Sequence, residues 1–248
     1  MSYEDQLKHQ VENAKTPTSK EFLTGLYSEL SKEIEISGEY LEIGAGAGIS
    51  SIFLDRYNVT RTDILPWGNG LVVGGVNAEE IPYEDGVFDG VFGMDMLHHM
   101  EFPYRVINDC MRVTKEKGKV IFIEPYVSLL SFSVYTIFHT EKTSIWKRVS
   151  PKKPAIGSLP EDGDQRMCQS IFLSRQGLRH LRNETNRNYS IEKRFIHPFS
   201  FFSTGGLSRP LKTKPEIIRR IQALEGKLPI WFLRLTASRI VVVINLEN

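Results

Sequence analysis

A short apolar strand leads into a glycine-rich turn at Leu41-Glu42-Ile43-Gly44-Ala45-Gly46-Ala47-Gly48, and the apolar stretch from Ile49 to Leu54 that follows has helical spacing. Glycine adopts positive φ without steric cost and lets a backbone approach a ligand closely. The first N–H groups of the following helix have no partners within that helix, so they are available to a ligand. The stretch therefore predicts a strand, a ligand-binding turn and a helix.

The spacing of the glycines separates this turn from two other nucleotide-binding loops. A dinucleotide-binding turn, G-x-G-x-x-G, would need glycine where the chain has Ile49. No Lys-Ser or Lys-Thr pair follows, so the turn is not a P-loop. Asp63 lies 19 residues after Gly44, at the end of the next predicted strand. A carboxylate there accepts hydrogen bonds from both hydroxyls of a ribose, so we expect a ligand that contains one.

Outward from the turn, strands alternate with helices along most of the chain. We expect strands at Tyr40–Ile43, Val59–Leu65, Val87–Met94, Val120–Ile123, Ile191–Ile196 and Arg239–Leu246. We expect helices from an N-cap at Ser19 to Ile34, at Pro103–Val113 with Lys115 to Lys119 closing it, near Ser174–Arg182, and from Pro215 to Gly226. Alternation with short loops predicts an α/β fold with about seven mostly parallel strands, flanked by helices.

Residues 126–170 interrupt this alternation. They combine an aromatic apolar stretch with a loop rich in Pro, Gly and Lys from Ser150 to Gly163, which is longer than an ordinary connection. We therefore predict a single domain over residues 1–248, with residues 126–170 as a lid or substrate-binding insertion. Core packing is the default interpretation of the aromatic stretch. If it is exposed, it would cover a hydrophobic ligand or contact a membrane surface.

Composition excludes several classes of protein. A hydrophobic content of 41% and a charged content of 25% are typical of a globular chain. Cys110 and Cys168 form no CxxC pair, which argues against a disulfide framework or a cysteine-based metal site and fits a reducing compartment. The N-terminus is too polar for a signal peptide, and the apolar stretches are too short to span a bilayer. We expect a soluble, cytoplasmic protein without a nucleic-acid-binding module.

Four ordered blocks of the sequence resemble one enzyme family. Leu41–Ser50 looks like motif I of the class I methyltransferases that use S-adenosyl-L-methionine (SAM). The later blocks of that family's small-molecule branch resemble Asn77–Tyr83, Val87–Val91 and Met96–His99. The likeness covers about residues 38–125, half of the chain. It implies a Rossmann-like sheet and a methyltransferase that converts SAM to S-adenosyl-L-homocysteine.

The resemblance also implies roles for individual residues. Around the turn, the expected cofactor-binding residues are Glu42 (toward the amino group, directly or through water), Gly44, Ala45, Gly46 and Gly48 (the methionine portion and ribose), and Asp63 with its neighbour Ile64 (the ribose hydroxyls). Farther along, they are Asn77 with its neighbour Ala78 (the adenine), and Met94 and Asp95 (beside the cofactor). The family often has Asp at position 77, and the asparagine retains the carbonyl acceptor.

His98 and His99 are the candidate catalytic residues. Both follow the predicted strand that ends at Met94, close to where the methyl group of SAM would lie. A hydroxyl acceptor usually needs a base, and histidine accepts a proton near neutral pH. Packing of both rings within a loop is the alternative interpretation. A metal site is not expected, because no third ligand stands at a suitable spacing.

The methyl acceptor is suggested by a finer resemblance. The blocks Glu124–Tyr126, Phe138–Glu141, Gly163–Gln165 and Gly205-Gly206 resemble methyltransferases of bacterial surface-polysaccharide biosynthesis, which implies a saccharide, lipid- or nucleotide-linked. Residues 1–104 carry a formal charge of −12, whereas residues 175–248 carry +9. Solvated helix faces alone would produce such a polarity. In functional terms, the acidic part suits a cationic cofactor and the basic part an anionic acceptor.

Two other functions compete with this interpretation. A noncatalytic SAM-binding or scaffolding protein would share every cofactor residue but would lack an open acceptor cavity. A nicotinamide-dependent oxidoreductase would use the same general fold, but Ile49 disfavours it.

Overall fold

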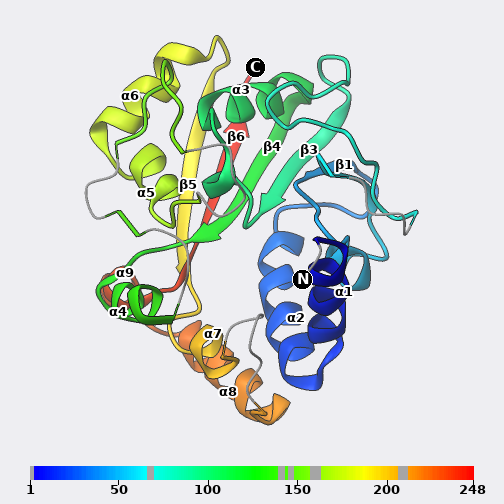
Figure 1. The fold of residues 1–248 in the computed structure, drawn as a ribbon. Helices are drawn as coiled ribbons and strands as arrows, with labels where there is room; N and C mark the ends of the chain where they lie inside the picture. Colours follow the sequence, from blue (N-terminus) through cyan, green and yellow to red (C-terminus); the bar gives the residue numbers. More distant parts are fainter. Residues whose placement is uncertain (1–2, 66–69, 139–142, 145–147, 157–162, 206–211) are drawn as a thin grey trace.

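A six-stranded sheet forms the centre of the computed structural model, which describes residues 3–65, 70–138, 143–144, 148–156, 163–205 and 212–248. The strand order is β2-β1-β3-β4-β6-β5 (Figure 1). The strands are β1 (Glu39–Ile43), β2 (Asn58–Thr62), β3 (Phe88–Met94), β4 (Thr114–Pro125), β5 (Tyr189–Ile196) and β6 (Arg239–Leu246). β1 to β4 are mutually parallel, and β6 is antiparallel to β4 and β5. The predicted α/β class is confirmed.

The strand count differs from the expected number by one within the described residues. All six strands expected at named positions are present. Outside β2 the sheet continues only as an isolated parallel bridge between Thr62 and Val73. Glycine weakens strands, and Gly74 and Gly75 follow Val73 directly, the second with φ 77°. The ladder therefore stops after one pair of residues.

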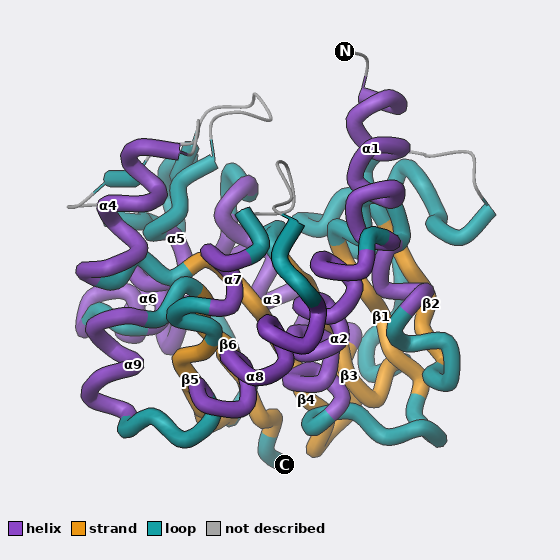
Figure 2. Tube along the Cα trace, turned by 90° about the horizontal axis from the view of Figure 1, so that it is seen from below, coloured by secondary structure: helices purple, strands orange, loops and turns teal. Residues whose placement is uncertain are grey.

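Helices cover both faces of the sheet. On one face lie α2 (Pro17–Ser31), α7 (Ser200–Ser203) and α8 (Pro215–Glu225), with α1 (Tyr3–Lys15) packed on α2. On the other lie α3 (Pro103–Val113), α5 (Met167–Phe172) and α6 (Arg175–Glu184). α4 (Leu129–Phe138) and α9 (Ile230–Thr236) contact each other at one side of the molecule (Figures 1 and 2).

Successive side chains of the central strands point alternately to the two faces of the sheet, which explains why the sheet lies between two layers of helices. In β4, Val120 and Phe122 pack against α3 and α5, whereas Ile121 and Ile123 pack against α2. In β6, successive side chains also pack alternately against the two helical layers. Successive side chains of a strand point to opposite faces, so an uninterrupted apolar run requires a helical layer on each side.

Three local predictions differ from the structure, two of them because they were wrong and one in the type of helix. Lys115 to Lys119 do not close a helix, because β4 begins at Thr114 directly after α3. α2 starts at Pro17 rather than after Ser19, since the fixed φ of proline suits the first turn. Residues Ile49–Ile52 form a short 3-10 helix, η1, instead of an α-helix. The predicted ends of the other helices are close: Ser174 caps α6 and Gly226 follows α8.

The segment 126–170 is described only in part. It contains α4 and α5, and between them the loop from Val149 to Ile156 packs partly into the core. Parts of the predicted insertion, namely residues 139–142, 145–147 and 157–162, lie outside the described residues, as does Gly206 of the Gly205-Gly206 block. Among the helices that are described, none has the length and apolar character needed to cross a membrane.

Candidate functional site

The predicted site residues gather along one edge of the sheet. β1 to β4 are parallel, so their carboxyl ends meet there, and β5 ends at the same edge because it is also antiparallel to β6. The first residues of β6 lie there for the same reason. Ligands of open α/β sheets bind at this edge.

The glycine turn after β1 adopts a conformation that other residues reach only with strain. Gly44, Gly46 and Gly48 have φ of 64°, 51° and 70°. The Ala45 N–H donates to the carbonyl of Thr62 over 2.9 Å, which ties the turn to the end of β2. A Cβ on Gly44 would lie 2.7 Å from Cβ of Met96, whereas nothing lies within 4 Å of a Cβ position on Gly46. The turn is therefore packed against the protein at Gly44 and has free space beside it at Gly46.

Asp63 lies directly against this turn. Its Oδ2 accepts from the Gly46 N–H over 2.8 Å, and its Oδ1 accepts from the Leu65 N–H over 3.0 Å. A carboxylate oxygen has a second lone pair, so each oxygen has the capacity to accept a further hydrogen bond, as the predicted role toward the ribose hydroxyls requires. The neighbouring Ile64 is 60% exposed, which leaves its side chain available to an apolar part of a ligand. The turn and Asp63 therefore fit a ribose-containing cofactor.

Glu42 lies beneath the turn. Its buried carboxylate accepts a hydrogen bond from the Ser50 hydroxyl and lies 3.5 Å from Nε of Arg61. Burial raises its pKa from 4.5 to about 7, although the Ser50 hydrogen bond and Arg61 act in the opposite direction. These contacts join β1 to η1 and β2. The expected contact with the amino group of the cofactor stays a prediction.

Asn77 and Ala78 differ in their exposure to solvent. Asn77 is exposed, and its Oδ1 accepts from the N–H of Glu79 over 2.9 Å, which leaves one lone pair of that oxygen for an adenine amino group. Ala78 is buried in the core. The role of both residues toward adenine stays a prediction.

Met94 and Asp95 lie at the end of β3. Asp95 has φ 52°, unusual for a residue other than glycine, and its N–H donates to the carbonyl of Ile123 over 3.0 Å. Its carboxylate accepts a hydrogen bond from Arg239, the first residue of β6. The sequence argument missed Arg239. A single arginine at the head of the apolar run Ile240–Ile244 was the available signal, because a charged residue in such a position needs a partner.

His98 is buried and paired with a buried carboxylate. Its Nδ1 lies 2.6 Å from Oε2 of Glu124, and the two side chains are 4% and 0% exposed. The other oxygen of Glu124 accepts from the N–H groups of Met96 and Leu97 over 3.0 and 2.8 Å. Glu124, at the end of β4, thereby holds the 3-10 helix η2 (Leu97–His99) and orients the His98 ring.

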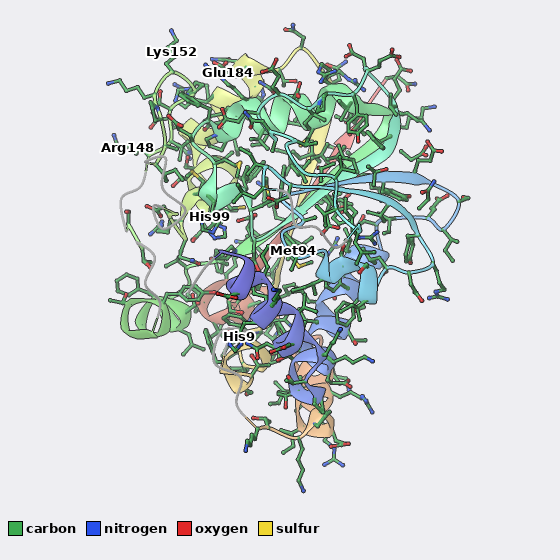
Figure 3. All side chains as sticks on the ribbon, turned by 45° about the vertical axis from the view of Figure 1, so that its right-hand side comes forward. His9, Met94, His99, Arg148, Lys152 and Glu184 are labelled. Carbon is green, nitrogen blue, oxygen red and sulfur yellow. The ribbon has the colours of Figure 1, made fainter. Side chains whose placement is uncertain are left out.

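His99 is half-buried and packs against His98, with ring centroids 4.1 Å apart. His99 ends η2, and Figure 3 labels it together with Met94, the last residue of β3. A Cβ on Gly163 would lie 2.7 Å from Nδ1 of His99, so glycine is needed where this loop crosses the rings. The N–H of Asp164 donates to the carbonyl of His98 over 3.0 Å. Part of the Gly163–Gln165 block thus packs on the histidine pair.

No group of three or more metal-binding side chains is found in the described part of the chain. Cys110 and Cys168 are buried free thiols in the described structure, and burial raises the pKa of both well above the usual value. A thiol that stays protonated is a poor nucleophile.

Residues 41–122 match a family model described as "Methyltransferase domain". Two curated proteins share 40% identity with short segments of the chain. One is a glycine/sarcosine/dimethylglycine N-methyltransferase of Actinopolyspora halophila, matched over 50 residues, and the other a sarcosine/dimethylglycine N-methyltransferase of Halorhodospira halochloris, matched over 47. The matches span 20% and 19% of this chain, and only 9% and 17% of the length of these relatives.

The fold is similar to that of solved methyltransferases. A SAM-dependent methyltransferase from Archaeoglobus fulgidus superposes with a TM-score of 0.57 over 92% of this chain and 95% of that one, at 15% identity. The family match and this fold together support an enzyme that uses SAM as its cofactor. Residues 41–122 thus match the methyltransferase domain family, in a chain whose fold is similar to that of a SAM-dependent methyltransferase.

Proposed function

We propose that the protein is a SAM-dependent methyltransferase that transfers a methyl group to a small-molecule acceptor. The observation that carries the proposal is the contact between Asp63 and Gly46, which unites the carboxylate expected to bind ribose and the glycine turn in one cradle. The domain match over residues 41–122 supports it independently. The cradle lies at the same edge of the sheet as His98 and Glu124, so a methyl donor and a proton acceptor would share one site.

Most of the catalytic work of this chain would be alignment and exclusion of water. SAM supplies the methyl group on a sulfonium, already activated for transfer. The turn and Asp63 would hold the nucleoside in a fixed position. Segments at the same edge would then bring the acceptor into line and keep water out, which favours the transfer by proximity.

For a hydroxyl acceptor, we propose that His98 or His99 removes the proton. When the proton of the His98 ring is on Nδ1, this nitrogen donates a hydrogen bond to Glu124. The other nitrogen, Nε2, is then the basic atom of the ring. His98 is almost completely buried, whereas His99 is only half-buried. His98 therefore has the fixed orientation that a base requires, and His99 has the better access.

For the acceptor we propose a saccharide hydroxyl, as the blocks around Glu124 and Gly163 suggest. The net positive charge of residues 175–248 supports an acceptor that carries phosphate or carboxylate groups. The curated relatives are named for glycine, sarcosine and dimethylglycine, so a small amino acid is the main competing acceptor. Both acceptor types would carry an anionic group, a phosphate or a carboxylate, but they differ in the atom that receives the methyl group.

We further propose that α9 is the part of the chain that contacts a membrane surface. Ile230, Trp231 and Leu235 are 58%, 63% and 45% exposed, and the exposed Arg234 lies among them. Apolar and indole side chains beside a cation suit the interface of an anionic bilayer. Trp231→Ala should reduce co-sedimentation with anionic vesicles, and Leu224→Ala on α8 should not. Equal sedimentation of both variants would rule out α9 as the contact.

The proposed function is tested with labelled SAM against sugars, sugar nucleotides, sugar phosphates, glycine and sarcosine. We expect transfer to one of these classes. A thermal-shift comparison should show stabilisation by SAM and none by NADH, since Ile49 does not fit the dinucleotide pattern. SAM binding without transfer to any acceptor would favour the noncatalytic SAM-binding or scaffolding protein. Stabilisation by NADH alone would contradict the proposal.

A further inference from the structure

Two buried nitrogen-rich side chains start from neighbouring backbone positions at the same sheet edge, beyond the cofactor cradle, and each contacts one ring of the Phe22–Phe201 pair. Ile196, the last residue of β5, pairs with Arg239, the first residue of β6, and His197 follows Ile196 directly. The side chains of Arg239 and His197 are only 7% and 8% exposed. Neither residue is among the expected cofactor-binding residues, although Arg239 pairs with one of them, Asp95.

Arg239 is incompletely satisfied by the protein. Its Nη1 donates to Asp95, and its guanidinium lies over the Phe201 ring with Cζ 4.8 Å from the centroid. Its Nε is buried and has no hydrogen-bond partner in the described structure. Burial lowers the pKa of Arg239 to about 10, so the side chain remains a cation at neutral pH. A buried cationic N–H without a partner is costly, which calls for an acceptor from outside the chain.

His197 shows the same feature in a strained backbone position. It has φ 54°, and its Nδ1 lies 3.1 Å from Oγ of Ser200 and 3.4 Å from Oε2 of Glu225. Glu225 is itself fixed by the N–H groups of Phe199 and Ser200 at 2.6 and 2.7 Å. The ring is therefore held in one orientation, while its buried Nε2 has no partner among the described residues.

A purely structural role explains only part of this arrangement. The ion pair with Asp95 accounts for one side of the Arg239 guanidinium, but Asp95 is 34% exposed and does not reach Nε. The same ion pair also gives no partner to the buried Nε2 of His197. Few buried polar groups in native proteins lack a partner, and two neighbouring ones suggest a common ligand.

The position of the pair suits an acceptor better than the cofactor. The cradle lies at the ends of β1 and β2, whereas β6 is separated from β3 by β4. Neighbouring strands are about 4.8 Å apart, which places β6 about 10 Å from β3. Asp95 reaches from β3 to Arg239 and so connects the two regions. A small molecule bound at Arg239 could extend to the methyl group from there.

We infer that Nε of Arg239 and Nε2 of His197 form an oxyanion-binding subsite, which holds a carboxylate or phosphate of the methyl acceptor. This inference rests on the proposed function, because it names the acceptor class of that same site. The planar guanidinium suits both groups, since it donates parallel hydrogen bonds to two oxygens. The imidazole Nε2 would donate to an adjacent oxygen of the same group in the form of the ring that carries a proton on both nitrogens, because Nδ1 faces the carboxylate of Glu225.

Inorganic phosphate and acetate are the probes, titrated by calorimetry into the full chain saturated with S-adenosyl-L-homocysteine. Chloride at equal ionic strength is the reference. We expect the wild type to bind at least one probe, and Arg239→Met to lose about tenfold or more in affinity, the change that follows from one hydrogen bond to a charged group. His197→Asn should weaken binding, because asparagine tolerates positive φ but lacks the imidazole. The preferred probe distinguishes a phosphate from a carboxylate acceptor.

Arg220→Met is the matched control, because it removes the same charge from an exposed position on α8. It should bind the probes as the wild type does. If Arg239→Met fails to fold, Arg239→Lys keeps the charge without the planar fork and should still bind the probes more weakly. Probe binding that is absent from the wild type, or unchanged in the folded Arg239 and His197 variants, would overturn the inference. The affinity for S-adenosyl-L-homocysteine, measured separately, tests the proposed function independently.

Discussion

Substitution of Asp63 by alanine removes the carboxylate that joins the glycine turn to the ribose position. The variant loses the hydrogen bonds from the N–H groups of Gly46 and Leu65. Gly46 is half-buried and Leu65 is 42% exposed, so water replaces the lost acceptors. We expect a loss of about 1–2 kcal/mol in the free energy of unfolding, which leaves the protein folded.

The loss in cofactor affinity should be larger than this structural cost suggests. The ribose hydroxyls would lose charge-assisted hydrogen bonds that water does not replace inside a closed site. A net loss of about 1.5–3 kcal/mol corresponds to an increase of about 10- to 150-fold in the Kd for SAM. Because the contact is to the nucleoside, the affinity for S-adenosyl-L-homocysteine should fall by the same factor.

Isothermal titration calorimetry with SAM and with S-adenosyl-L-homocysteine measures both effects, and circular dichroism verifies the fold. Asp85→Ala is the matched control, because Asp85 is an exposed aspartate whose partner is Arg112. It should bind both ligands as the wild type does. Wild-type affinity in a folded Asp63→Ala variant would remove Asp63 from the site and refute the assignment of the cradle.

Three further predictions concern the base, the insertion and pH. His98→Ala or His99→Ala should lower turnover of a hydroxyl acceptor about 10²- to 10⁴-fold at unchanged SAM affinity, and near-normal turnover of both contradicts a histidine base. Hydrogen exchange in residues 126–170 should slow when product and acceptor bind, whereas uniformly slow exchange in the free protein indicates a fixed subdomain. Glu42, with its pKa raised to about 7, binds a proton more tightly in the folded state. Its stabilising contribution is complete below pH 4.5 and is lost as the pH rises to about 7. Thermal melts of Glu42→Gln should lack this dependence, and an unchanged profile would refute it.

Local patterns were enough to predict the strands and the cofactor turn. Residues 240–244 are apolar without interruption, and such runs indicate strands that are covered on both faces. Gly44, Gly46 and Gly48 indicate a left-handed turn because backbone sterics act within one or two residues. Their offset from Asp63 spans one strand-helix-strand unit, so short-range geometry also brings the carboxylate to the turn. Local sequence errs where two signals compete, as at Thr114, where the charged Lys115 to Lys119 resembled the end of a helix.

The side of the site beyond β3 depends on tertiary structure. β6 enters antiparallel between β4 and β5, and this insertion brings Arg239 to Asp95, 144 residues away in the chain. The same holds for Glu124 and His98, and for His197 and Glu225, which are 26 and 28 residues apart. The sequence by itself determined the strands and the turn, because both follow from local sterics and periodicity, whereas the cofactor class was implied by the resemblance to the methyltransferase family. Only the packed sheet decided which buried charges meet, because the cost of desolvation depends on the neighbours that strand order provides.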